Sequence, residues 1–116
     1  MQFSTILTSF ALASACVFSP GIAAIAQTRE TAKVDETILE MNDAFKRGDR
    51  KRLTSLLPQV RGHALEPWGA YWEIRARLDE ASAQDIQNFL YRYSGTYQED
   101  RLRNDWLLLL GQRREW

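Results

Sequence analysis

Residues that build metal and redox sites are almost missing from this sequence. Among its 116 residues there is one cysteine, Cys16, and one histidine, His63. A single cysteine cannot form an internal disulfide, and one histidine without cysteine neighbours does not supply the ligand cluster that zinc requires. The six glycines are scattered along the chain, so no glycine-rich phosphate-binding loop is present. We therefore expect no metal site and no cofactor.

Charged side chains are absent from residues 1–28, and all charges follow that segment. The 15 Lys+Arg and 15 Asp+Glu give a formal net charge of +0. Balanced charge provides no electrostatic footprint for nucleic acid or for an anionic membrane surface, so neither is expected as a partner. A chain that is 45% hydrophobic and 26% charged has the composition of an ordinary globular domain.

The uncharged segment has the features of a secretory signal peptide. An apolar run over residues 3–18 is followed by the helix-breaking pair Pro20-Gly21 and by Ala24-Ile25-Ala26, which fits the small-residue rule of signal peptidase sites. We predict that residues 1–26 form the signal peptide, that residues 27–33 form a short linker, and that the mature protein is periplasmic.

Two alternatives exist for this segment, because no Lys or Arg precedes the apolar run, whereas a signal peptide normally begins with a positively charged region. A membrane anchor is disfavoured because the run from Phe3 to Phe18 is shorter than the ~20 residues of a span and contains Ser and Thr. Lipid attachment at Cys16 is disfavoured because Ala13 stands where a large aliphatic residue is needed. After cleavage, we expect the mature chain to be free of cysteine and to have no stable membrane span.

The rest of the chain has the apolar spacing of successive helices. The first stripe predicts a helix that ends at Gly48, and it consists of Val34, Ile38, Met41 and Phe45. Asp49 is placed to cap a short second helix, which Pro58 would stop.

Three further helices are indicated by residues that typically begin or end helices. The first of these helices begins at Pro67. The second begins at Ser82 with Asp85 and ends at Gly95, and the third begins at Thr96 with Glu99 and ends at Gly111. The joint between the last two helices is expected to hold Phe89, Leu90, Leu102 and Trp106. No segment alternates polar and apolar residues with the period of a strand, so the predicted fold is all-α.

A loose internal repeat suggests how these helices are arranged. Phe45–Leu53 and Leu108–Trp116 each have an apolar helix end, a glycine, a short basic run and a large apolar residue. Their offset corresponds to two helical hairpins of about 34 residues, the unit of tetratricopeptide-like arrays. We predict antiparallel helical hairpins stacked as a short α-superhelix or solenoid over residues 34–116, truncated at the C-terminus. The truncated end would expose Leu107–Leu110 and Trp116, which favours self-association.

Candidate catalytic residues are few. His63 lies in a predicted turn, and no serine or cysteine nucleophile motif accompanies it. The acid pairs Asp35-Glu36, Asp79-Glu80 and Glu99-Asp100 stand at helix ends beside arginines, where caps and ion pairs are expected. A glycosidase acid instead needs an apolar cleft that keeps it protonated. We therefore assign no catalytic, cofactor-binding or metal-binding residue.

Aromatic residues are abundant after the leader, and we interpret them as filling the joints between short helices, with a glycan-binding groove as the alternative. They include Trp68, Tyr71, Trp72, Tyr91, Tyr93, Tyr97, Trp106 and Trp116. The arginine-rich stretches at 47–52 and 101–103 are interleaved with acids and are interpreted as solvated faces.

Two segments, residues 63–78 and 86–107, together resemble the N-terminal superhelical region of the soluble lytic murein transglycosylases. The parts that carry the resemblance are Tyr71-Trp72, Phe89-Leu90, Gly95-Thr96-Tyr97, Arg101-Leu102-Arg103 and Asp105-Trp106-Leu107. They occur here in the order of that family, and the resemblance covers residues 34–116.

The resemblance implies an array of helical hairpins that is a scaffold beside a separate catalytic domain. The enzymes of that family are periplasmic and cleave the glycan strands of peptidoglycan, with a catalytic glutamate in a Glu-Ser pair. This sequence has no Glu-Ser pair, so no catalytic residue is transferred. The expected function is a non-catalytic scaffold portion of such an enzyme, with peptidoglycan as partner through the complete protein and no activity in this chain alone. The alternative is a free-standing periplasmic helical-repeat module that binds a protein or glycan partner.

Overall fold

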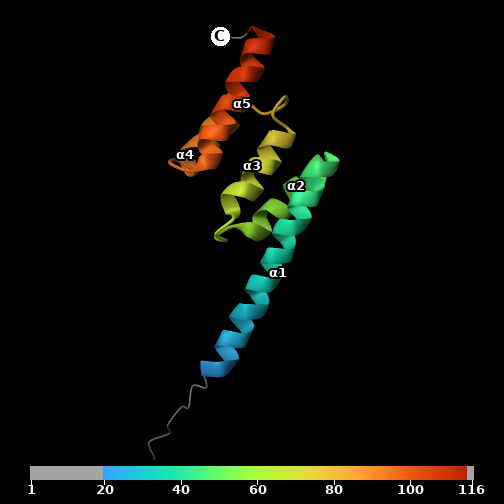
Figure 1. Cartoon of the computed structure of the whole chain (residues 1–116), viewed down its shortest axis with the longest axis vertical. Helices are drawn as coiled ribbons and strands as arrows, with labels where there is room; N and C mark the ends of the chain where they lie inside the picture. The colour runs from blue at the N-terminus through green and yellow to red at the C-terminus, as the bar shows by residue number, and fades with distance from the viewer. Residues whose placement is uncertain (1–19, 115–116) are drawn as a thin grey trace, which may run out of the picture.

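The computed structural model describes the backbone of residues 20–114 and the side chains from Ala24 onward. This part of the chain contains α-helices, one short 3₁₀ helix and no strand, so the predicted all-α fold is confirmed for it (Figure 1). The elements are α1 (Pro20–Arg47), α2 (Arg50–Leu56), η1 (Leu57–Val60), α3 (Glu66–Ala76), α4 (Ala83–Arg92) and α5 (Tyr97–Arg113).

Helix α1 consists of two halves with different surroundings. The side chains from Ala24 to Lys33 are exposed, and Figure 1 shows this half projecting away from the other helices. From Val34 onward the helix packs against the body through the predicted stripe, and it ends where Gly48 adopts a left-handed backbone with φ 72°. Residues 27–33, predicted as a linker, lie within this helix. Pro20 is its first residue, which suits proline because the first helical turn has no use for its missing N–H.

The first apolar cluster lies between α1, α2 and η1. Its buried members are Ile38, Met41, Ala44, Leu53, Leu56 and Val60. Asp49 caps α2 as predicted, because its Oδ1 accepts the backbone N–H of Arg52 at 3.2 Å. The α-helix ends at Leu56, before Pro58, as predicted, and the chain continues as one 3₁₀ turn, η1, that contains Pro58.

Helix α3 packs closely on this cluster at Gly69. A Cβ atom added there would lie 3.2 Å from both the Met41 Sδ and the Val60 Cγ2. The missing side chain therefore lets α3 approach α1 and η1, and it makes α3 the central helix of the molecule.

The second apolar cluster joins α3 to α4 and α5. Its buried members are Ala70, Tyr71, Ile74, Leu78, Ile86, Phe89, Tyr93 and Leu102. Of the four residues predicted for the last joint, Phe89 and Leu102 are buried, whereas Leu90 and Trp106 are half-buried. The capping box of α4 is complete, since Ser82 and Asp85 each accept the backbone N–H of the other. At α5, Thr96 accepts from the Glu99 N–H, but Glu99 accepts from Gly95 rather than from Thr96.

The predicted end of the last helix at Gly111 is wrong. Helix α5 continues to Arg113, and Arg114 takes the left-handed cap with φ 56°. The Arg113 guanidinium donates to the Asp79 carbonyl at 2.7 Å, which holds this extra turn against the loop after α3. Gly48 is a left-handed turn whereas Gly111 is helical, so the two copies of the proposed sequence repeat do not share a turn.

Candidate functional site

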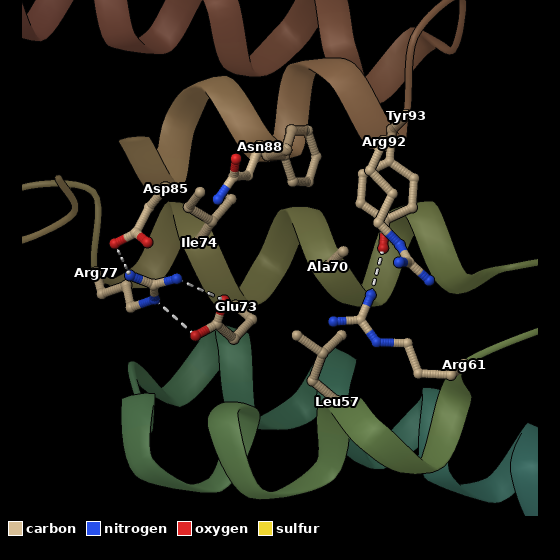
Figure 2. Close-up of a pocket in the computed structure, with 11 residues that line it drawn as sticks. Leu57, Arg61, Ala70, Glu73, Ile74, Arg77, Asp85, Asn88, Arg92 and Tyr93 are labelled. Atoms are coloured by element: carbon tan, nitrogen blue, oxygen red, sulfur yellow. Dashed lines mark hydrogen bonds and ion pairs between the residues drawn. The ribbon is translucent and has the colours of Figure 1, made fainter. Parts of the chain in front are cut away.

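A cleft along α3, between η1 on one side and α4 on the other, is the candidate site (Figure 2). It offers a volume of about 180 Å³. Apolar side chains line its middle, and they come from Leu57, Ala70, Ile74 and Phe89. Charged groups gather at its two ends: Arg77 joins Glu73 to Asp85 at one end, and Arg61 and Arg92 lie at the other. Glu66, near the start of α3, pairs with Arg92, at the end of α4, so the two helices run antiparallel.

Arg77 organises one end of the cleft. Its Nε and Nη2 donate to the two carboxylate oxygens of Glu73 at 2.6 and 3.3 Å, and its Nη1 donates to Asp85 Oδ2 at 3.2 Å. Glu73 is only 6% exposed and also accepts from the Thr54 hydroxyl at 3.2 Å. The Glu73 carboxylate raises the pKa of Arg77, and the Arg77 and Ser82 hydrogen bonds lower the pKa of Asp85. This end is therefore a network of acidic and basic side chains that are hydrogen-bonded to one another.

Two arginines share one carboxylate at the other end. Arg61 Nη1 and Arg92 Nη2 both donate to Glu66 Oε1, at 3.0 and 2.9 Å. Partial burial alone would raise the pKa of Glu66, but the hydrogen bonds and charges of the two arginines outweigh it and hold that pKa below its ordinary value. Arg61 also donates to the Tyr93 hydroxyl at 2.8 Å, and burial raises the pKa of that hydroxyl. These contacts connect η1, α3 and α4.

His63 lies in the turn before α3, as predicted, and contacts α1. Its Nε2 is 2.7 Å from Asp35 Oδ1, and its Nδ1 accepts the backbone N–H of Leu65 at 3.0 Å. Because Nδ1 is an acceptor, the proton of the neutral ring is on Nε2 and is donated to Asp35. Both ring nitrogens are thus engaged, and His63 tethers the turn to the first packed residues of α1.

The acid pairs noted in the sequence lie apart from one another. Asp79 and Glu80 both pair with Arg50 at 3.2 Å, on the face of α2. Glu99 accepts from the Gly95 N–H and from Arg103, and these two contacts lower its pKa in that order. The structure brings none of these pairs into the cleft along α3.

The aromatic side chains form a row across three helices. Ring centroids are 6.4 Å apart for Phe45 and Trp72, 5.9 Å for Trp72 and Trp68, and 5.8 Å for Trp68 and Tyr97. Trp68 and Trp72 are half-buried, so their rings cover the joint between α1, α3 and the start of α5. Tyr71, on the inner side, donates to Asp105 at 2.6 Å; burial and this bond raise its pKa to about 12.

Sequence reasoning missed the charged residues of the cleft. The spacing of Glu73 and Arg77 is a recognisable i,i+4 pair, but nothing in the sequence indicates that Glu73 is buried. Arg61, Glu66 and Arg92 come together only because α3 and α4 pack antiparallel, and no local pattern predicts that meeting.

Comparison with protein-family models, with characterised proteins and with solved structures found no match to this chain. Within residues 20–114, no group of three or more His, Cys, Asp or Glu side chains is arranged to hold a metal ion. Within the same described part, no helix combines the length and apolar character needed to cross a membrane.

Proposed function

We propose that this chain is a non-catalytic helical scaffold of an exported peptidoglycan-remodelling enzyme, the N-terminal part of a lytic transglycosylase. The observation that carries the proposal is that the two segments with the family resemblance, residues 63–78 and 86–107, pack together. Every buried member of the second apolar cluster comes from one segment or the other. A helical scaffold is held together by a core that residues from separate helices share, and these two segments share such a core.

A short superhelix is part of this proposal. Helices α3 and α4 are antiparallel neighbours, and α5 packs on both of them. Stacked helices of this kind are the unit of α-solenoids, in which each unit contacts only its neighbours. Leu107 and Leu108 on α5 are exposed, so they offer an apolar surface on which a further hairpin or a second copy of the chain would pack.

The catalytic step is assigned to a separate domain. A transglycosylase acid must carry its proton near the glycosidic oxygen, which requires an apolar pocket that keeps the carboxyl neutral. Glu73 is the buried carboxylate of the described residues, and Arg77 donates hydrogen bonds to both of its oxygens. This pairing supports a structural role for Glu73.

The transcript beyond the Trp116 codon tests the scaffold proposal. An open reading frame that encodes further helical hairpins and a domain with a Glu-Ser pair would support it. A stop codon directly after Trp116 would contradict it and would favour the free-standing periplasmic module.

Export is tested by the N-terminus of the protein recovered from periplasm. The predicted cleavage site, Ala24-Ile25-Ala26, lies within α1 in the folded chain, so cleavage must act on the unfolded or locally opened segment. Intact mass and N-terminal sequencing should give a chain that begins at Gln27. A product that retains Met1 in the membrane fraction would instead establish the anchor.

A further inference from the structure

The cleft along α3 carries opposite charge at its two ends. At one end, the cations Arg61 and Arg92 share the single carboxylate of Glu66, which leaves an excess of one positive charge. At the other end, Glu73 and Asp85 share the single cation Arg77, which leaves an excess of one negative charge. Figure 2 shows Glu73, Arg77 and Asp85 at one end and Arg61 and Arg92 at the other, with Leu57 and Ala70 between them.

The two helices that form the walls of the cleft, α3 and α4, give the same distance between its charged ends. Glu66 and Glu73 are seven residues apart on α3, and Asp85 and Arg92 are seven residues apart on α4. At a rise of about 1.5 Å per residue, each wall separates the ends by about 10 Å. An extended peptide advances about 3.3–3.6 Å per residue, so three residues span this distance.

Groups at both ends keep hydrogen-bonding capacity for a ligand. Arg92 donates to Glu66 through Nη2, and its side chain is 55% exposed, so a ligand can reach its remaining N–H donors. Among the described residues, Asp85 accepts through Oδ2, while its Oδ1 has no donor. Asn88, one turn after Asp85 on α4, lines the cleft between the ends, where its amide can bond a peptide group.

We propose that this cleft binds a short peptide of about three small residues that has free amino and carboxyl termini. The peptide carboxylate lies against Arg61 and Arg92, and the ammonium group lies against Asp85 and Glu73. The apolar middle, formed by Ala70, Ile74 and Phe89 among others, contacts the peptide side chains. The volume of about 180 Å³ is below that of typical small-molecule pockets, which restricts the side chains to small ones.

This inference is independent of the proposed scaffold function, because it rests only on the charges and spacing of the cleft. If the chain proves to be part of a wall enzyme but binds no peptide, only the peptide-binding proposal fails. If it binds the peptide but belongs to no wall enzyme, only the scaffold proposal fails.

Trialanine is the probe, titrated into the full chain and followed by amide chemical shifts. We expect saturable shifts at residues of α3 and α4 around the cleft. Acetylation of the amino terminus or amidation of the carboxyl terminus should each weaken binding by about fivefold, the value of one exposed charge pair. Dialanine should bind more weakly than trialanine because it cannot reach both ends, and added salt should weaken trialanine binding.

Two variants assign the ends of the peptide. Arg92→Gln should weaken the binding of trialanine and should reduce the difference in affinity between trialanine and its amide, while the effect of acetylation persists. Asp85→Asn should do the reverse, and either variant suffices if the other does not fold. Arg103→Gln, an exposed arginine that pairs with Glu99 outside the cleft, is the matched control and should bind like the original chain.

The proposal is overturned if the folded chain shows no saturable shifts with trialanine at millimolar concentrations. It is equally overturned if trialanine capped at both ends binds as well as free trialanine, or if Arg103→Gln and Arg92→Gln have the same effect.

Discussion

Arg77 Nε lies 2.6 Å from the Glu73 carboxylate, and this contact neutralises the buried acid of the cleft. Glu73 stands on the face of α3 that packs towards α2, where the Thr54 hydroxyl is its other partner. A carboxylate in such a place is stable only while its cation is present, because desolvation penalises an unpaired charge. The pair therefore fixes the register between α2, α3 and, through Asp85, α4.

Arg77→Gln should lower the free energy of unfolding by about 2 kcal/mol, less than the 3–5 kcal/mol typical of a fully buried pair because Arg77 is about a third exposed. Urea unfolding measures the change. The double variant Glu73→Gln with Arg77→Gln should recover part of the loss, since no buried charge is then left without a partner. Simple additivity of the two single changes would show that the contact does not couple these residues.

The lowered pKa of Glu66 predicts that the protein loses stability in acid. Its pKa is lowered in the folded state, so its contribution is fully present above the ordinary glutamate value near 4.5 and is lost as the pH falls through the folded value. Glu66→Gln should cost about 1 kcal/mol at pH 7 because both arginine partners are well exposed. The midpoint of thermal unfolding, measured from pH 7 to pH 2, should fall less steeply below pH 4.5 for Glu66→Gln than for the original chain. Parallel curves would count against the assignment.

The two halves of α1 should respond differently to proline. Thr31→Pro lies where side chains are exposed, so only local helix is lost and the free energy of unfolding should change by less than about 1 kcal/mol. Asp43→Pro, also at an exposed position, lies in the packed half and should cost about 3 kcal/mol or more. Equal losses in urea unfolding would mean that the N-terminal half of α1 also packs on the body.

The burial of Leu102 and Trp106 at the second apolar cluster predicts which of two substitutions to alanine lowers the free energy of unfolding more. Leu102 is fully buried, and Leu102→Ala should cost about 3 kcal/mol or more. Trp106 is only half-buried, so Trp106→Ala should cost about 1–2 kcal/mol despite the larger side chain removed. Chemical denaturation of the two variants gives the comparison, and a larger loss for Trp106→Ala would place it deeper in the joint than the structure does.

Helix boundaries that depend on local capping could be predicted from the sequence. Asp49 and Ser82 cap their helices, and Gly48 ends α1, because each interaction involves only residues within one turn. The boundary at Gly111 could not be predicted, since the Arg113 contact to the Asp79 carbonyl is made across the fold. The low helix propensity of glycine does not end α5 at Gly111, where the helix continues for two more residues.

The charged ends of the cleft were beyond sequence reasoning for the same reason. Arg92 and Glu66 are 26 residues apart, and their contact depends on the antiparallel packing of α3 and α4. His63 could be placed in a turn by its neighbours Gly62 and Pro67, but its partner Asp35 lies 28 residues away on α1. Local patterns therefore locate the elements, and only the packed structure shows which charged side chains meet.

The last prediction is that residues 27–116 do not cleave peptidoglycan. Cleavage needs a protonated carboxyl group at the glycosidic oxygen. Both carboxylate oxygens of Glu73 accept hydrogen bonds from Arg77. The arginine pair at the other end of the cleft lowers the pKa of Glu66, and Arg77 lowers that of Asp85. Glu66 and Asp85 are therefore ionised at neutral pH and have no proton to donate, while the oxygens of Glu73 are occupied by Arg77.

Release of anhydro-muropeptides from purified sacculi is the assay, with a complete lytic transglycosylase as the positive control. We expect no product above the level of a heat-denatured sample. Turnover that disappears in Glu73→Gln, and persists in the matched change Glu80→Gln on the exposed loop after α3, would show that the chain is itself an enzyme. In that case the Glu73 carboxyl group would have to exist with its proton in the complex with substrate, which requires Arg77 to move away from it.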